Sequence, residues 1–317
     1  MKAVYQRQTV EIIVEEGLLQ RLSQVIDPFR RYFIITDQIV HHFHHDYLDL
    51  FPNHDVFIMM AGEEQKNMDT VMQICKEMLA KNYDRHDCIL ACGGGVVLDV
   101  AGFVASIYKR GIDYINIPTS LMAQVDSSIG GKVGINFSGF KNQLGSFYHP
   151  LKILIDPLVL STLNKQEMTS GMCEVMKYAI LFDREMYDRL LTHTYLLKEL
   201  ILKCVLYKVE VTTSDEYDRG KRQLLNFGHT IGHAIEAKYQ LPHGISIAYG
   251  MYFESKRQDI LELLNSYGLD FSLAFEGLNE YMLKDKKRSG EKITRIKILE
   301  IGKAILEEGD MDDFFTK

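Results

Sequence analysis

The sequence has few of the features that mark disulfide-stapled, membrane-spanning or nucleic-acid-binding proteins. Its five cysteines are an odd number without a C-x-x-C pair, which favours free thiols in a reducing compartment. No run approaches the roughly 18 apolar residues of a membrane span, and the start, MKAVYQRQTVEIIV, lacks the apolar core of a secretory signal. No stretch collects enough Lys and Arg to follow a phosphate backbone, and 36 basic against 43 acidic residues leave a net charge of −7. We therefore expect a cytoplasmic protein that binds neither nucleic acid nor membranes.

The composition is typical of a folded globular chain. Hydrophobic residues make up 46% of the sequence and charged residues 25%, values close to the averages for soluble domains. At roughly 150 residues per domain, the 317 residues predict about two domains, each large enough to bury a core.

Short apolar runs rich in Val, Ile and Phe recur through the first half of the chain. They lie at residues 10–14, 32–36, 55–60, 88–92, 114–118 and 152–156. Helical patterns fill most of the intervals between them, as at residues 67–81 and 96–108. Strands that are apolar throughout and alternate with helices are typical of a parallel sheet covered on both faces. We expect a doubly wound, Rossmann-like α/β domain over residues 1–157.

The pattern changes after Pro157. Residues 165–263 show helical periods with few β-branched clusters. This predicts a mainly α-helical second domain over residues 158–317.

Three consecutive glycines at residues 93–95 follow the fourth apolar run and precede a helical pattern. Glycines let backbone N–H groups approach an anion, and a helix N-terminus adds its positive dipole end, so a nucleotide pyrophosphate fits there. The segment is not G-x-G-x-x-G and does not follow the first strand, so a plain tight turn is an equal alternative. Asp37, at the end of the second run, is placed either to bind a ribose hydroxyl or to cap a helix.

Residues 125–145 hold five glycines, two lysines and two asparagines without helical or strand periodicity. We interpret them as a long polar loop, which inside a compact domain is more often functional than structural. The charges of Lys132 and Lys141 suit a phosphorylated or carboxylated small molecule. A solvated surface loop is the alternative.

The segment NFGHTIGHAIE carries two histidines one helical turn apart, His229 and His233, and His243 follows after a short turn. Imidazole nitrogens bind zinc, and a carboxylate such as Glu174 would complete a three-ligand site with one open position. The spacing does not decide which helical histidine is the ligand, and a histidine pair without metal is the alternative. The run HHFHH at residues 41–45 has no carboxylate or cysteine arranged around it, so we interpret it as a solvated helix face.

Taken together, these segments resemble the 3-dehydroquinate synthases of the shikimate pathway. The resemblance runs from about residue 62 to about residue 290 and rests on GGGVVLDVAGFVA, RGIDYINIPTSLMAQVDSSIGGKVGIN, KNQLGSFYHP, EVMKY and LLNFGHTIGHAIE, in the family's order. It implies an NAD-binding Rossmann-like domain, a helical domain with a catalytic zinc or cobalt ion, an active site in the cleft between them, and a homodimer.

The resemblance also implies site residues. The expected metal ligands are Glu174, His229 and His243, while His233 points to the substrate. The expected NAD contacts are Asp37, Glu63, Lys66, Gly94, Gly95, Val96, Asp99, Thr119, Ser120, Asp126, Lys141 and Thr162. The expected substrate contacts are Arg110, Asp126, Lys132, Lys141, Asn142, Lys177, Lys208, Arg222, Asn226, His233 and Lys286, with Lys287 as the alternative to Lys286.

The reaction implied by the resemblance converts 3-deoxy-D-arabino-heptulosonate 7-phosphate, a phosphorylated sugar acid, into 3-dehydroquinate and phosphate. Transient oxidation by NAD acidifies a neighbouring carbon so that phosphate leaves, and reduction, ring opening and aldol closure follow. Two alternatives are another sugar-phosphate cyclase, of the 2-deoxy-scyllo-inosose or epi-valiolone synthase type, and a metal-dependent polyol dehydrogenase. Arg222, Asn226 and His233 favour the dehydroquinate synthases over the other cyclases, and the phosphate-binding lysines disfavour a dehydrogenase.

Overall fold

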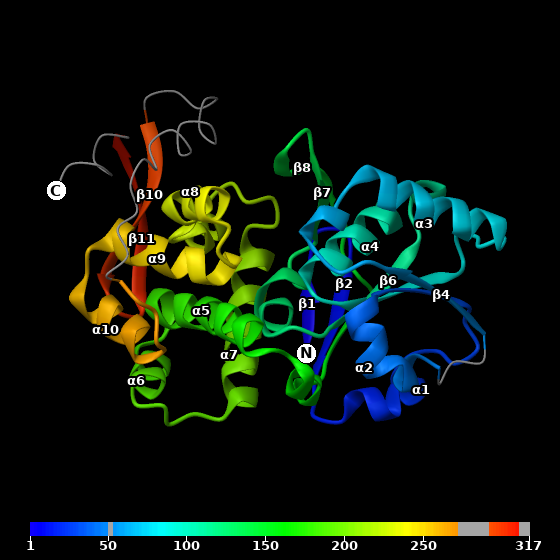
Figure 1. Cartoon of the computed structure of the whole chain (residues 1–317), viewed down its shortest axis with the longest axis horizontal. Helices are drawn as coiled ribbons and strands as arrows, with labels where there is room; N and C mark the ends of the chain where they lie inside the picture. The colour runs from blue at the N-terminus through cyan, green and yellow to red at the C-terminus, as the bar shows by residue number, and fades with distance from the viewer. Residues whose placement is uncertain (50–52, 272–291, 311–317) are drawn as a thin grey trace. The chain divides into compact units, whose positions relative to one another are not determined.

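The structure is a computed structural model that describes residues 1–49, 53–271 and 292–310 (Figure 1). The chain divides into two compact units, Met1–Leu163 and Asn164–Lys317. The 3₁₀ helix η5 (Pro157–Thr162) lies between the sequence-based boundary and this division. Within the described ranges, no helix is both long and apolar enough to cross a membrane.

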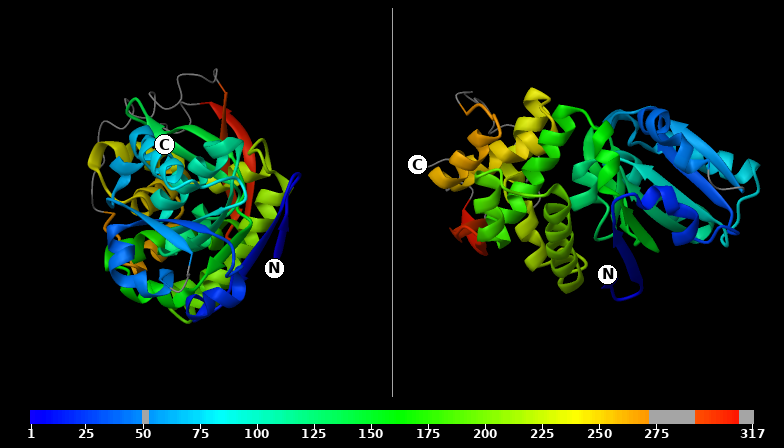
Figure 2. Two further views of the ribbon diagram at one scale, coloured as in Figure 1. Left: turned by 90° about the vertical axis from the view of Figure 1, so that its right-hand side faces the viewer. Right: turned by 90° about the horizontal axis from the view of Figure 1, so that it is seen from below.

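The first unit is built on a seven-stranded sheet with the order β1-β2-β9-β6-β5-β3-β4. Its strands are β1 (Lys2–Val4), β2 (Thr9–Val14), β3 (Tyr32–Asp37), β4 (His54–Met59), β5 (Cys88–Gly93), β6 (Asp113–Pro118) and β9 (Lys152–Ile155). β1 and β2 form an antiparallel hairpin at one edge, dark blue in Figure 2, and the other neighbours pair in parallel. Every residue of β5 is buried, which explains its uninterrupted apolar sequence. The six predicted strands are confirmed.

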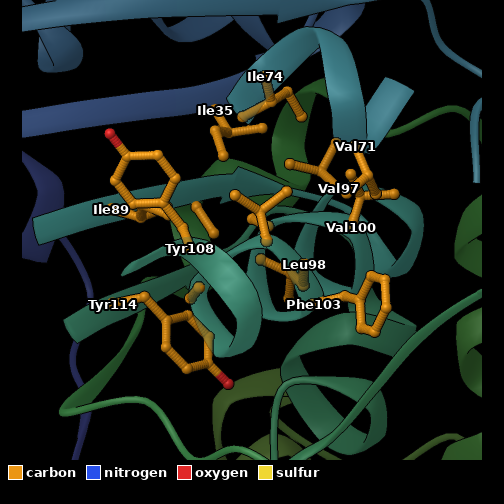
Figure 3. Packing of buried hydrophobic residues seen from close by; sticks show 14 of the residues in the cluster. Ile35, Val71, Ile74, Ile89, Val97, Leu98, Val100, Phe103, Tyr108 and Tyr114 are labelled. Carbon is orange, nitrogen blue, oxygen red and sulfur yellow. The ribbon is translucent and has the colours of Figure 1, made fainter. Parts of the chain in front are cut away.

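Helices cover both faces of this sheet. Phe33 and Ile35 of β3 pack against α3 (Met68–Ala80) and α4 (Gly95–Ile107), and Figure 3 shows part of this cluster around Ile35, Val71 and Ile74. The alternate β3 residues Tyr32 and Ile34 pack on the other face, against η1 (Leu18–Arg21), α1 (Leu22–Val25) and α2 (Gln38–Leu48). Successive residues of one strand thus serve two cores, as the predicted doubly wound fold requires.

The strand order explains the position of the glycine segment. The five neighbouring strands β4-β3-β5-β6-β9, numbered along the chain from β3, have the order 2-1-3-4-5, and β2 lies parallel beyond β9. The chain therefore leaves β3 and β5 in opposite directions. In open α/β sheets, ligands bind outside the carboxyl ends of the strands at such a reversal. Asp37 ends β3 and Gly93 ends β5. The glycines therefore follow the fourth apolar run and still lie at the expected binding edge.

Residues 125–145 form a short π-helix and a hairpin, so the expected long loop is wrong. The elements are η4 (Ala123–Ser127), β7 (Lys132–Phe137) and β8 (Phe140–Phe147), and β7 pairs antiparallel with β8. Gly134 pairs with Gly145, and a Cβ on Gly145 would lie 2.4 Å from the Val133 carbonyl oxygen. Close pairing through glycine removes the side chains that would have shown a strand period.

The second unit is mainly helical, as predicted. Its helices are α5 (Lys165–Phe182), α6 (Arg184–Leu191), α7 (Leu197–Ser214), η6 (Lys221–Asn226), α8 (His229–Tyr239), α9 (His243–Ser255) and α10 (Gln258–Ser266). An antiparallel hairpin of β10 (Lys292–Glu300) and β11 (Lys303–Asp310), not expected from the sequence, joins them through a bond from Gly302 N to Ile180 O of 2.9 Å. α8 and α9 pack closely, because a Cβ on Gly250 would lie only 1.9 Å from the Gly228 carbonyl oxygen.

Candidate active site

The glycine segment lies beyond the carboxyl end of β5, where α4 begins with Gly94 as its N-cap. A Cβ on Gly94 would lie 3.6 Å from Ser120 Oγ, and one on Gly95 would lie 3.2 Å from Ser127 Oγ. Ser127 Oγ is buried and has no hydrogen-bond partner among the described residues. The N-terminus of α4 is thus accompanied by two hydroxyl groups, and together they form a donor set suited to a pyrophosphate. Ser127 was missed in the sequence because only the folded chain brings it to Gly95.

The other residues that the resemblance assigns to NAD follow the carboxyl ends of the same parallel strands. Asp37 ends β3, Glu63 and Lys66 follow β4, Val96 and Asp99 follow β5, Thr119, Ser120 and Asp126 follow β6, and Thr162 follows β9. Lys141 lies on β8. Because parallel strands have their carboxyl ends at one edge, the fold gathers these separate segments on one side of the sheet.

Asp37 caps α2 with one carboxylate oxygen. Its Oδ1 accepts hydrogen bonds from Ile39 N and Val40 N at 2.8 and 2.9 Å. Within the described part of the chain, nothing donates a hydrogen bond to Oδ2. Asp37 is therefore a helix cap whose second oxygen can still bind a hydroxyl group.

Lys66 is buried and joins three segments of this edge. Its ammonium group donates to Asp99 Oδ2 at 2.5 Å and to Asn142 Oδ1 at 2.6 Å. Asn136 extends the network, since its Nδ2 donates to Glu63 Oε1 at 2.8 Å and its Oδ1 accepts from Asn142 N at 2.9 Å. Burial raises the pKa of Asp99, against the opposing effect of the Lys66 charge. Because Lys66 only donates, the amide oxygen of Asn142 is fixed toward it and the Nδ2 group is left for an anion.

The substrate residues expected in this unit are not all brought together. Lys132 begins β7 and Lys141 lies on β8, both exposed, and Lys141 Nζ is 3.9 Å from Glu63 Oε1. Arg110 is exposed and precedes β6. β6 runs parallel to β5, with Asp113 paired to Cys88 and Pro118 paired to Gly93. Arg110 therefore lies at the amino edge of the sheet, opposite the glycine segment.

Three histidines meet in the second unit. His229 begins α8, His233 follows one turn later and His243 begins α9. Their candidate ligand nitrogens all lie within 4.8 Å of one another, and no other group of this kind occurs among the described residues. The close packing of α8 on α9 produces this group, which sequence spacing alone left open.

Hydrogen bonds at the Nδ1 atoms orient two of these rings. His243 Nδ1 lies 3.0 Å from Glu236 Oε2, and His229 Nδ1 lies 3.2 Å from the Phe227 carbonyl oxygen. Because both partners only accept, each Nδ1 carries a proton, and Nε2 is the ring nitrogen that remains to bind a metal. Burial, together with the nearby charge of Lys177, holds the pKa of His229 well below its usual range. The His229 ring is therefore neutral and ready to bind a metal.

Glu174 on α5 supplies a buried carboxylate to the same place. Its side chain is 2% exposed, and its Oε1 lies 4.0 Å from His243 Nε2. Lys177 Nζ forms a buried ion pair with Oε2 at 2.5 Å, whereas Oε1 has no hydrogen-bond partner among the described residues. A buried carboxylate costs several kcal/mol, roughly, unless a cation balances it. A buried carboxylate oxygen without a hydrogen-bond partner, beside an imidazole Nε2, fits a divalent metal such as zinc or cobalt.

The second unit also contains three buried cationic side chains. Lys177, Lys208 and Arg222 are 1%, 6% and 3% exposed. Arg222 Nη1 donates to the Glu216 carbonyl oxygen at 2.6 Å. These buried cations, of which Lys177 pairs with Glu174, place positive charge inside the second unit, and positive charge suits an anionic ligand. Asn226 ends η6, two residues before the α8 N-cap, whereas Lys286 and its alternative Lys287 lie outside the described residues.

The HHFHH run lies on α2, but it is not uniformly solvated. His44 is buried, and its Nε2 lies 3.1 Å from Thr162 Oγ1. His42 and His45 are exposed. The expectation of a solvated face is thus wrong for His44, whose position on the inner side of α2 directs it to the core.

Sequence comparison then decides the family. Residues 56–170 match the family model described as 3-dehydroquinate synthase N-terminal, and residues 171–288 match the C-terminal one. The chain belongs to the 3-dehydroquinate synthase family. A 3-dehydroquinate synthase from Alkaliphilus metalliredigens is 37% identical to it, over 94% of this chain and 91% of the relative.

Solved structures of other cyclases share the fold. A 2-deoxy-scyllo-inosose synthase complexed with carbaglucose-6-phosphate, NAD⁺ and Co²⁺ has a TM-score of 0.86 and 26% identity, covering 99% of this chain and 97% of its own. A 2-epi-5-epi-valiolone synthase from Streptomyces hygroscopicus with NAD⁺ and Zn²⁺ bound has a TM-score of 0.88 and 25% identity, covering 98% and 96%. These relatives confirm the predicted fold class, and the groups that they hold agree with the predicted cofactors, NAD and Zn²⁺ or Co²⁺.

Proposed function

We propose that this member of the 3-dehydroquinate synthase family converts 3-deoxy-D-arabino-heptulosonate 7-phosphate into 3-dehydroquinate and phosphate. The observation that carries the proposal is the buried Glu174 carboxylate, whose Oε1 has no hydrogen-bond partner among the described residues, together with three clustered histidines. The first unit of the same chain supplies a helix N-terminus suited to a pyrophosphate. NAD and a divalent metal are the cofactors, and the 37% identity to a named 3-dehydroquinate synthase selects this reaction among the cyclases.

NAD, when bound, supplies transient oxidation and later reduction of a substrate alcohol, so that it is regenerated within each turnover. The backbone N–H groups at Gly94 and Gly95 and the Ser127 hydroxyl would hold the pyrophosphate, and Asp37 Oδ2 would accept a ribose hydroxyl. Lys66 would act indirectly, because its ammonium group holds the side chains of Asp99 and Asn142 in place.

Glu174, His229 and His243 would hold the metal. It would polarise the hydroxyl and ketone oxygens of the substrate, which lowers their proton affinity. The hydrogen bonds at both Nδ1 atoms support this ligand set, because they leave Nε2 of His229 and His243 as the free donor atoms. His233 would then contact the substrate.

The substrate has two anionic groups, a phosphate and a carboxylate, and we assign different cationic residues to each. Lys132 and Asn142 are proposed for the phosphate, because a lysine and a fixed amide N–H group both donate to phosphate oxygens. Lys177, Arg222 and Asn226 are proposed for the carboxylate and hydroxyl groups. The burial of Lys177 and Arg222 supports this, since a desolvated cation binds a carboxylate more strongly than an exposed one.

We further propose a cytoplasmic homodimer with no nucleic-acid or membrane partner. All five cysteines are free, which suits a reducing compartment. Light scattering of the native protein should give twice the 36.5 kDa chain mass. A mass of one chain at all concentrations would contradict the dimer.

Substrate choice tests the reaction against the other cyclases. Purified protein loaded with metal and NAD should form 3-dehydroquinate from the heptulosonate 7-phosphate and should leave glucose 6-phosphate and a heptulose 7-phosphate unchanged. Turnover of either sugar phosphate, with none of the heptulosonate, would contradict the proposal and favour a different cyclase.

A further inference from the structure

Glu236 occupies a special position between the two helices that carry the histidines. It lies on α8, three residues before the helix ends at Tyr239, and α9 begins only four residues later at His243. Gln240 has a φ of 54°, a left-handed conformation that reverses the chain between the helices. The turn brings Glu236 Oε2 to 3.0 Å from His243 Nδ1, with the Glu236 side chain 13% exposed.

The two carboxylates around His243 lie at different ring nitrogens. Glu174 Oε1 is 4.0 Å from Nε2, and Glu236 Oε2 is 3.0 Å from Nδ1. The two nitrogens of an imidazole direct their lone pair and their proton apart, so the two carboxylates cannot have the same role. Glu174 is placed as a ligand beside Nε2, and Glu236 is placed as the acceptor of the Nδ1 proton.

We propose that Glu236 is a positioning residue of the metal centre, which holds His243 as an Nε2 ligand and strengthens its binding of a divalent cation. An accept-only carboxylate keeps the proton on Nδ1 and so keeps the lone pair on Nε2. Its negative charge also makes the imidazole more basic toward a metal. The inference rests on the proposed function for the presence of a metal, but not for the identity of the substrate.

His229 provides an internal comparison. Its Nδ1 bonds to a neutral backbone carbonyl, that of Phe227, at 3.2 Å. Side-chain substitution cannot remove that acceptor, whereas substitution of Glu236 removes the acceptor of His243. The effect of a Glu236 variant should therefore appear at His243 and not at His229.

Metal affinity is the first measurement. Zn²⁺ binding to metal-free protein, by competition with a chromogenic chelator, should weaken by about 10- to 100-fold in Glu236→Ala, as is typical when such a partner is lost. Glu236→Gln, which keeps an accepting oxygen without the charge, should fall between Glu236→Ala and the wild type. The control Glu185→Gln, in the same unit and 74% exposed, should bind like the wild type. Wild-type affinity in both Glu236 variants would overturn the proposal.

The tautomer of His243 is the second measurement. Nitrogen-15 spectra of histidine-labelled, metal-free protein should show His243 protonated on Nδ1 in the wild type and a mixture of tautomers in Glu236→Ala, with His229 unchanged. A general structural defect would alter both rings. An unchanged His243 tautomer would overturn the inference even if the affinity falls.

The two proposals fail in distinguishable ways. A wild-type protein that binds Zn²⁺ but forms no 3-dehydroquinate would contradict the proposed function and leave the role of Glu236 intact. A wild-type protein that binds no Zn²⁺ would contradict the role of Glu236. If Glu236→Ala does not fold, as judged by circular dichroism, Glu236→Gln and Glu236→Asp provide the same comparison.

Discussion

At the scale of single residues, the environment of Glu174 gives the strongest support for a metal site. Its buried Oε1 has no hydrogen-bond partner among the described residues, and hydrogen bonds at Nδ1 orient the rings of His229 and His243. The sequence left open which helical histidine binds the metal. The ring orientations support the proposed ligands His229 and His243. Ring orientation depends on tertiary partners such as Glu236, which spacing in the sequence does not reveal.

Glu174→Ala and His229→Ala should each lose bound metal and nearly all activity while the fold survives. The loss of several kcal/mol of charge stabilisation corresponds to about a thousand-fold in rate. Metal content after dialysis, by atomic emission, and steady-state rates are the measurements. His233→Ala is the matched control and should retain its metal. Stoichiometric zinc in the Glu174 or His229 variant would show that the ligand assignment is wrong.

Lys132→Ala should weaken binding of the phosphorylated substrate far more than binding of NAD. A hydrogen bond to a charged group contributes about 1.5–3 kcal/mol, so the KM for the substrate should rise about 10- to 100-fold. The KM for NAD should stay the same, as should both constants in the control Lys76→Ala, an exposed lysine on α3. An equal rise in the KM values for substrate and for NAD would show that Lys132 contacts the cofactor and not the substrate phosphate.

At the scale of elements, helices and strands were predictable where burial leaves a pattern in the sequence. β5 is buried on both faces and reads as a continuous apolar run, and α3 shows a clear helical period. β7 and β8 were not predictable, because Gly134 and Gly145 meet across the hairpin where other strands carry apolar side chains. Ser127 was missed, and the partners of Lys66 were not predictable, because Gly95, Asp99 and Asn142 come from other segments of the chain.

His44 on α2 makes the stability of the first unit depend on pH. Burial lowers the pKa of His44 below 6.5, with the Asp156 charge acting in the opposite direction. As pH falls through 6.5, the unfolded chain takes up a proton that the folded state resists, so the free energy of unfolding decreases. Urea denaturation between pH 8 and pH 5.5 should show a shallower decline for His44→Gln than for the wild type.

His42→Gln is the matched control for this measurement, because His42 is exposed on the same helix. It should reproduce the wild-type decline. Identical declines in His44→Gln and the wild type would show that His44 does not resist protonation in the folded state.

At the scale of the whole molecule, the two units carry different parts of the chemistry. The first gathers nucleotide-binding groups at the carboxyl edge of its sheet, and the second gathers histidines, a carboxylate and buried cations. The motifs of the sequence were enough for the family and the cofactors. They did not reveal that Arg110 lies at the opposite edge of the sheet from the glycine segment, because strand direction is a property of the assembled sheet.

We propose that one chain uses NAD and a metal in a self-regenerating cycle that eliminates phosphate. The most direct test is phosphate release from 3-deoxy-D-arabino-heptulosonate 7-phosphate by purified protein, with and without NAD and with a metal chelator. We predict release of phosphate with an equal amount of 3-dehydroquinate, dependent on NAD, abolished by the chelator and without net NADH. No release from folded, metal-loaded protein, or net accumulation of NADH with a polyol, would show that the protein does not catalyse this cycle.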